Sequence, residues 1–303
     1  MEHTPKNMAL QLGALITLVV SISSLLVLLF GVINLLFPDA ADSYWQYESA
    51  QDSIRYAIAS LVVFFPTYLV LTRKVNVARR HESGLYHTLT KWLVYFALLV
   101  GGLVILGDLV AVIMAFLNGE LTTRFILKAG SILVVVGAAF WYYQKDALGY
   151  WNTRERESIR IGLITAALVA ISVVYGYVQI DSPSETRDRA IDEQQINDLT
   201  DMQWRIEAHM ATNGQLPESL TEVYEGLDMP ESPEDRDAYQ YEVTGETTYN
   251  LCATFTSDRQ DRKDEYSYAV PVAEKGYNPQ NYNWEHGVGE TCFERTVTKP
   301  ETL

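Results

Sequence analysis

The chain has 303 residues, of which 48% are hydrophobic and 20% are charged, and its formal net charge is −15. The charge is unevenly divided: residues 1–180 carry 13 Lys+Arg and 11 Asp+Glu, whereas residues 181–303 carry 10 Lys+Arg and 27 Asp+Glu. A net charge of −17 in the second part repels phosphate groups, which excludes nucleic acids and anionic lipid headgroups as its partners. The shift in composition near residue 180 predicts two domains, 1–180 and 181–303.

Five apolar segments occupy the first domain. A helix needs about 20 apolar residues to cross roughly 30 Å of hydrocarbon, and five segments approach or exceed that length: 9–37, 54–72, 92–117, 125–143 and 161–180. The first is too long for the apolar region of a cleaved signal peptide, so we expect a retained anchor. Gly130 and Gly137, seven residues apart on one face, predict close helix packing. The sequence therefore predicts an all-α transmembrane bundle of five helices.

The distribution of basic residues predicts how this bundle is oriented. Ten Lys and Arg residues lie on one side of the expected bundle, and only Arg55, Arg124 and Lys128 lie on the other. Because cationic loops stay in the cytoplasm, we expect a cytoplasmic N-terminus, and five crossings then place residues 181–303 outside the cell. Both cysteines, Cys252 and Cys292, lie in that outer part, and disulfides persist in oxidising compartments. The expected location is the cytoplasmic (inner) membrane of a bacterium, with the lipid bilayer as partner.

One acidic residue, Asp108, lies deep in an expected span. The tight turn at Asn118 and Gly119 makes the third and fourth helices a hairpin, which brings Asp108 toward Lys128, one helical turn after Arg124. An intramembrane carboxylate suggests a proton or cation relay. The alternative is an ion pair that fixes the hairpin, and we favour it because no second deep acid is present. The sequence thus predicts an intramembrane charge cluster of Asp108, Arg124 and Lys128.

The second domain begins with a predicted helix of about 30 residues. Ser182 as N-cap, Pro183 at the first helical position and Glu185 returning to the cap mark its start, and Gly214 follows its end. Its first turns are rich in charge and are expected to be a solvated stalk. Alternating apolar residues then predict a hairpin over 239–243 and 249–255, a third strand over 266–270 and a fourth short segment at 292–293. A long helix on a small antiparallel sheet is an α+β fold.

Three features of this domain are candidate sites. Cys252 and Cys292 are expected to form one structural disulfide, since no other cysteine is available. The acidic loop is a weak calcium candidate, because basic residues interrupt it; its acids are Asp258, Asp261, Asp264 and Glu265. His286 is expected to be structural, since a metal site needs several convergent ligands. We expect no cofactor and no catalytic residue.

Two segments carry a resemblance to type IV pilins and type II secretion pseudopilins: Leu-Pro-Glu-Ser-Leu at 216–220, which follows the long helix, and Tyr-Asn-Leu-Cys at 249–252. The resemblance covers about residues 160–255. It implies that a membrane helix leads into an amphipathic helix packed on a small sheet, with envelope or pilus-like proteins as partners. The chain departs from that pattern because its relevant membrane helix is the fifth, and Pro183 interrupts the continuous helix.

The membrane half is similar to an uncharacterised bacterial multi-pass family, catalogued as a domain of unknown function. The carrying segments are Phe-Pro-Thr-Tyr-Leu at 65–69, Gly-Asp-Leu at 107–109 and Asn-Gly-Glu-Leu-Thr at 118–122. Arg124 with Phe125 and Tyr142 with Tyr143 extend the similarity. It implies an architecture and no activity.

These features predict a non-enzymatic cell-envelope protein that displays an acidic, disulfide-bonded, pilin-like extracytoplasmic domain for binding or assembly. The alternative is a small transporter or channel with Asp108 in its path and the outer domain as a regulatory cap.

Overall fold

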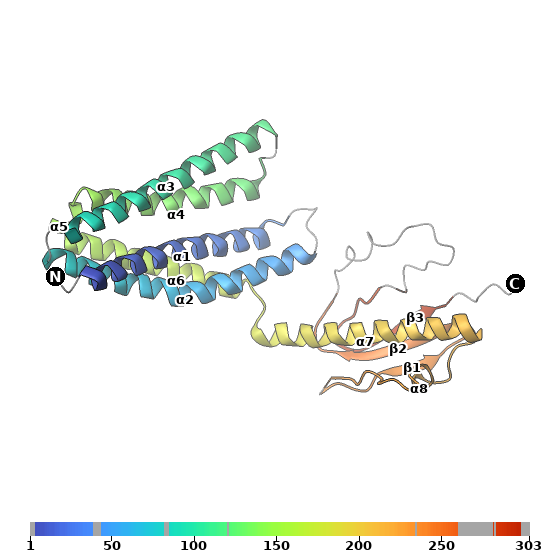
Figure 1. Ribbon diagram of the computed structural model, residues 1–303. Coiled ribbons are helices and arrows are strands. Elements are labelled where there is room, and N and C mark those ends of the chain that lie inside the picture. The colour runs from blue at the N-terminus through green and yellow to red at the C-terminus, as the bar shows by residue number, and fades with distance from the viewer. Residues whose placement is uncertain are drawn as a thin grey trace. The chain divides into compact units, whose positions relative to one another are not determined.

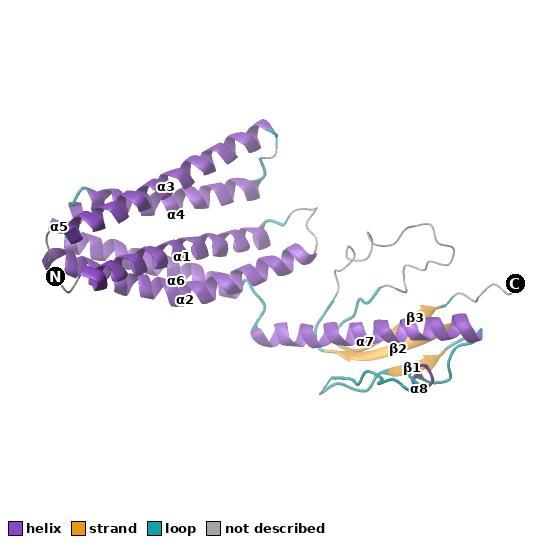
Figure 2. Ribbon diagram, viewed as in Figure 1, coloured by secondary structure: helices purple, strands orange, loops and turns teal. Residues whose placement is uncertain are grey.

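The computed structural model describes residues 4–38, 44–81, 85–119, 121–233, 235–259, 281 and 283–297. The chain divides into two compact units, Met1–Ile180 and Asp181–Leu303, which we call the N-terminal and C-terminal units. The first is helical and the second combines helices with a small sheet (Figures 1 and 2).

In its described residues the N-terminal unit contains five long helices and one short one. Their bounds are α1 Thr4–Leu36, α2 Tyr44–His81, α3 Leu85–Leu117, α4 Thr123–Ala147, α5 Tyr150–Thr153 and α6 Glu155–Val178. The five long helices that the sequence predicts are therefore present, and all five are long and apolar enough to span a membrane. Most of them begin or end several residues beyond the expected apolar segments, because polar helix ends continue past the hydrocarbon-length stretch.

Close approach between helices occurs at two glycines that the sequence did not single out. A Cβ atom added to Gly31 of α1 would lie 2.5 Å from Cγ1 of Ile54 in α2, and one added to Gly176 of α6 would lie 2.5 Å from Cδ1 of Leu28. By contrast, an added Cβ at Gly130 or Gly137 would meet no heavy atom within 4 Å, so the expectation for those two residues is wrong. Small residues thus bring α1 against α2 and α6, where dispersion contacts hold helices together in lipid.

The core of the N-terminal unit lies around these contacts. Its buried members come from α1, α2 and α6: Leu28, Val32, Ile54, Ala57, Leu61, Phe65 and Val169. The α3–α4 hairpin turns at Asn118 and Gly119, where Gly119 has a φ of 72°, and the hydroxyl of Thr122 caps α4 by accepting from the Phe125 N–H at 3.1 Å.

In the C-terminal unit, α7 Pro183–Asn213 is followed by α8 Leu220–Val223 and the strands β1 Gln240–Val243, β2 Thr248–Phe255 and β3 Gly289–Thr296. The capping box of Ser182 and Glu185 is formed as predicted, and the helix ends at Gly214 in the left-handed conformation, with a φ of 74°. The three strands form an antiparallel sheet in the order β1-β2-β3. The predicted third strand, 266–270, lies outside the described residues.

The strand β3 is longer than the short segment expected at 292–293, because all eight of its residues pair with β2. The core of the unit forms between α7 and one face of the sheet (Figure 2). Alternate residues of β2 point into it, namely Tyr249, Leu251, Ala253 and Phe255, and they meet Leu199, Met202, Ile206 and Met210 of α7. Period-two alternation on the strand and helical spacing on α7 together produce this two-layer core.

Candidate functional site

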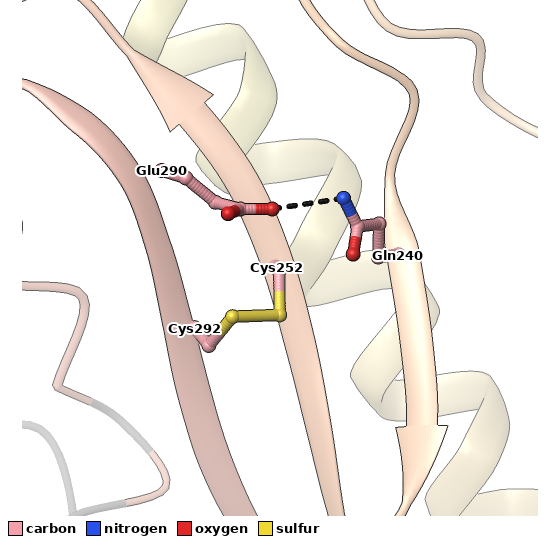
Figure 3. The surroundings of a disulfide bond; sticks show 4 residues. All are labelled: Gln240, Cys252, Glu290 and Cys292. Carbon is pink, nitrogen blue, oxygen red and sulfur yellow. Dashed lines mark hydrogen bonds between the residues drawn. A yellow bond between two sulfur atoms is a disulfide. The ribbon is translucent and has the colours of Figure 1, made fainter.

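The two cysteines are joined where β2 and β3 run side by side. Cys252 and Cys292 are register partners in the antiparallel pair, with their Cα atoms 4.0 Å apart, and they form a disulfide (Figure 3). Next to it, the Gln240 side chain on β1 donates a hydrogen bond to Glu290 on β3 at 2.8 Å. The two cysteines are 40 positions apart in the sequence. A disulfide that closes a loop of that length stabilises the folded state by on the order of 4 kcal/mol in the chain-entropy model. The bond therefore fixes β3 to the centre of the sheet.

The structure does not bring Asp108 together with the two membrane cations. Arg124 donates from Nε to Oδ1 of Asn34 at 2.8 Å, and Nζ of Lys128 lies 5.9 Å from the centre of the Phe30 ring. Asp108 makes no hydrogen bond or ion pair with any residue that the structure describes. Both cations thus contact α1, and the expected ion pair within the α3–α4 hairpin is not formed.

Of the calcium candidates only Asp258 lies among the described residues, and Asp261, Asp264 and Glu265 lie outside them. The neighbouring Arg259 is directed toward α7, where its Nη1 is 3.7 Å from Oε2 of Glu193. Across the described ranges, no group of three or more His, Cys, Asp or Glu side chains is placed to hold a metal ion.

A buried carboxylate that the sequence did not reveal connects α7 to the end of β2. Asp192 is only 2% exposed, although it lies in the charged segment that was expected to be a solvated stalk, so that expectation is wrong for this residue. Its Oδ2 accepts hydrogen bonds from the backbone N–H groups of Thr256 and Ser257, at 3.1 and 2.7 Å, and from the Ser257 hydroxyl at 2.6 Å. Its Oδ1 lies 3.6 Å from Nη2 of Arg236. These partners compensate the cost of burying the charge.

His286 packs beside this carboxylate site as part of the core. Its ring stacks on Phe255 with 3.7 Å between centroids, and its backbone oxygen accepts from the Arg259 N–H at 2.8 Å. The side chain is 4% exposed, and burial lowers the pKa of the imidazole, because the cationic form loses its hydration. His286 is therefore held as a neutral packing residue.

A buried guanidinium holds the other edge of α7. Arg295 of β3 donates from Nε to Oε1 of Gln203 at 2.9 Å and from Nη2 to the backbone oxygen of Asn283 at 2.8 Å. Its guanidinium also lies 4.1 Å from the centre of the Trp284 ring, and burial lowers its pKa to about 10. Helix α7 is thus bonded to β3 as well as to the end of β2.

Two tyrosines fix the polar side of α7 to the segments that precede the sheet. The Tyr239 hydroxyl donates to Asp198 at 2.7 Å, and the Tyr224 hydroxyl donates to Asp201 at 2.5 Å. Burial is the largest cause of the raised pKa of both phenols, and the hydrogen bonds to carboxylates raise it further. The tyrosines therefore remain protonated donors at neutral pH. On the same helix, Trp204 is 67% exposed.

The N-terminal unit contains a cavity of about 70 Å³ at one end of its helices. Its described lining comes from α1 (Gln11, Ala14, Leu15), α2 (Thr72, Val75, Asn76), α3 (Leu93, Val94, Ala97) and α4 (Tyr142, Tyr143, Asp146). The polar members lie near the ends of the membrane-length stretches, and the apolar members complete the wall. No sequence motif indicates this cavity, since each helix supplies only three residues.

Comparison with known proteins assigns part of the chain. Residues 8–143 match the model of a domain of unknown function, DUF5671. The matched range contains every lining residue of the cavity except Asp146. No curated protein and no solved structure matches the chain. The stretch from α1 to most of α4 is therefore similar to DUF5671, a domain of unknown function.

Proposed function

We propose that this chain is a non-enzymatic protein of the bacterial cell envelope that displays its C-terminal unit outside the cell for binding or assembly. The five membrane-length helices provide the anchor, and the asymmetry of Lys and Arg favours a cytoplasmic N-terminus. The disulfide agrees with an oxidising compartment on the side of the C-terminal unit. The arrangement of α7 on a small antiparallel sheet supports a pilin-like domain.

The observation that carries this proposal is the contrast between the interior and the surface of α7. Inward, Asp192, Gln203 and the aliphatic residues are bonded or packed against the sheet. Outward, Trp204 is 67% exposed in a unit whose net charge is −17. Tryptophan is enriched at the centres of binding interfaces, and acidic surfaces attract cationic partners. The partner is therefore a protein surface that offers basic residues around an apolar contact for Trp204.

Site-specific photo-crosslinking in whole cells tests this proposal. A photoreactive residue in place of Trp204 should give a discrete adduct whose yield falls as ionic strength rises, because charge attraction is screened by salt. The matched control is Leu227, which is 58% exposed in the same unit. Equal adducts at both positions, or an adduct that salt does not affect, would contradict the proposed interface.

The alternative function, a small transporter or channel, keeps one specific observation in its favour. Asp108 lies within the candidate span Trp92–Leu117 and makes no bond to any residue in the described part of the chain. A carboxylate in that position suits a proton or cation relay. Ion flux in proteoliposomes that the wild-type chain supports and Asp108→Asn abolishes, at unchanged thermal stability, would replace the anchor proposal with this one.

A further inference from the structure

We propose that the Cys252–Cys292 disulfide is a redox-active bond, which a protein dithiol with a basic surface opens and closes while the C-terminal unit stays folded. The proposal is independent of the binding function assigned to Trp204, because Trp204 lies on α7 and α7 covers the other face of the sheet.

The disulfide lies on the face of the sheet that α7 does not cover. Alternate residues of a strand point to opposite faces, and Leu251 and Ala253 of β2 and Phe293 of β3 point into the core against α7. Cys252 and Cys292 therefore point away from that helix (Figure 3). Cys252 is 6% exposed, whereas Cys292 is an exposed residue. Exposed disulfides are the ones that exchange with thiols, and Cys292 offers the accessible end of this one.

The place of β3 in the sheet makes the Cys292 sulfur the point of attack. A thiolate displaces one sulfur of a disulfide from the side opposite the leaving sulfur, and the S–S bond runs from β2 to β3 (Figure 3). Because β3 is at the edge of the order β1-β2-β3, no further described strand blocks approach to Cys292. Approach to Cys252 would come from the side of β1, where its register partner Gln240 is bonded to Glu290.

The exchange proceeds in two displacements. A thiolate of the partner forms a bond to Sγ of Cys292 while the S–S bond breaks, and Cys252 leaves as a thiolate that takes up a proton. The second thiol of the partner then displaces Cys292 from the mixed disulfide, and Cys292 takes up a proton in turn. Two electrons thus pass from the dithiol to the cysteine pair, and the partner becomes a disulfide. The reverse sequence, with the oxidised partner, forms the bond again.

The strand β3 is held in place when the bond is open. Phe293 is buried in the core, and Arg295 is 2% exposed and donates from Nε to Oε1 of Gln203 at 2.9 Å. Beyond the strand, the Val297 N–H donates to the Thr247 backbone oxygen at 2.9 Å. None of these contacts involves a cysteine. The two thiols therefore remain register partners and can form the bond again without a search.

The charge around the bond selects the partner. Glu290 and Glu294 are exposed and lie two positions on either side of Cys292 on the same face of β3, and Glu242 is exposed on that face of β1. Residues two apart on a strand are separated by about 7 Å, within the screening length of about 8 Å in physiological salt. No residue of the described strands that points to this face is Lys or Arg. An anionic thiol is therefore repelled, whereas a thiol among basic groups is attracted.

The test measures how fast small thiols of different charge reduce the full-length protein in a nonionic detergent. The probes are cysteamine, which is cationic, β-mercaptoethanol, which is neutral, and mercaptoethanesulfonate, which is anionic. Each rate is divided by the rate of the same thiol with neutral hydroxyethyl disulfide, which corrects for differences in thiol reactivity. Maleimide labelling and mass spectrometry count the released cysteines.

We expect rates that are proportional to thiol concentration without denaturant. At low salt the corrected rate should be about tenfold higher for cysteamine than for mercaptoethanesulfonate, because each nearby carboxylate changes the energy of the approaching charge by a few tenths of a kcal/mol or more. This ratio should decrease at high salt. After reduction the unit should still melt cooperatively, and hydroxyethyl disulfide should restore the bond.

Charge variants separate the local effect from the net charge of the unit. The double variant Glu290→Gln with Glu294→Gln should lower the ratio to about threefold. The matched control Glu225→Gln removes an exposed carboxylate elsewhere in the same unit and should leave the ratio unchanged. Reduction that occurs only in denaturant, or at a rate independent of thiol concentration, would mean that the bond opens only by unfolding and would overturn the proposal. Equal corrected rates for all probes, or an unchanged ratio in the double variant, would overturn the charge selection on which the partner assignment rests.

Discussion

Asp192 shows how a single buried charge organises the C-terminal unit. Its carboxylate accepts three hydrogen bonds from Thr256 and Ser257, residues more than 60 positions further along the chain. Removing one partner of a buried ionic contact leaves the other partners unsatisfied, which costs several kcal/mol. The residue is therefore a long-range connection between α7 and the end of β2.

We expect Asp192→Asn to lower the free energy of unfolding of the C-terminal unit by about 2–4 kcal/mol, because an amide presents N–H groups where the carboxylate accepts them. Asp198→Asn is the matched control. Asp198 is partly exposed and accepts one hydrogen bond, from the Tyr239 hydroxyl, so this variant should lower the free energy of unfolding by about 1 kcal/mol or less. Denaturant unfolding of the full-length protein measures both changes. Equal losses for the two variants would show that Asp192 has no special role.

His286 predicts a pH dependence for the same unit. Burial lowers the pKa of its imidazole in the folded state, whereas the unfolded chain titrates near pH 6.5. The unfolded state therefore takes up the proton first as pH falls, so stability is complete above about pH 6.5 and declines below it. His286→Phe keeps a ring against Phe255 and removes the proton site. Between about pH 7 and 5, the melting temperature of the wild type should fall more steeply with pH than that of this variant. An equal fall in both proteins would contradict the assignment.

At the scale of elements, local signals were sufficient for helix ends and insufficient for contacts between helices. Ser182, Pro183 and Glu185 lie within four residues of one another, so their capping geometry follows from local sequence and is found as predicted. The burial of Asp192 was missed, because the groups that hydrogen-bond its carboxylate belong to Thr256 and Ser257, which are distant in the sequence. The pairing of Asp108 with Lys128 failed for a related reason: the hairpin turn does not determine which neighbouring helix the cations of α4 contact, and both contact α1.

Helix packing in the N-terminal unit gives a prediction with an internal control. Gly31→Ala places a methyl group 2.5 Å from Cγ1 of Ile54 and 3.2 Å from the Ala50 backbone oxygen, so α1 and α2 must separate. Gly130→Ala places the same group in open space in a helix of the same unit, and alanine is about 1 kcal/mol better than glycine in a helix interior. Thermal unfolding in detergent should show a lower melting temperature for Gly31→Ala than for the wild type, and no decrease for Gly130→Ala. Similar losses would mean that glycine entropy, and not close approach, decides both sites.

At the scale of the whole molecule, composition indicated five apolar helices and an α+β remainder, and the structure contains them. The candidate site was not visible in the same way. The cavity takes three residues from each of four helices, and none of them is unusual among its sequence neighbours. Periodicity shows which face of a helix is apolar, but the residues that enclose a cavity depend on how the helices pack against one another.

The orientation of the membrane helices is the remaining expectation that one measurement decides. The described connections between helices offer two exposed positions for an introduced cysteine: Thr153, before α6, and Asn118, between α3 and α4. The native cysteines are joined in a disulfide and do not react without reduction. Because basic residues concentrate near Thr153 and favour the cytoplasm, a membrane-impermeant maleimide should label Asn118→Cys in intact cells. It should label Thr153→Cys only after permeabilisation.

The reverse labelling pattern would invert the bundle and place the ends of α1–α4 that form the cavity on the outer side. Gln11 and Asp146 lie toward the same end of the helices as Thr153, so the result also decides which leaflet the cavity is near. With the expected orientation this is the cytoplasmic leaflet, and labelling of Thr153→Cys from outside intact cells would place the cavity at the outer leaflet instead.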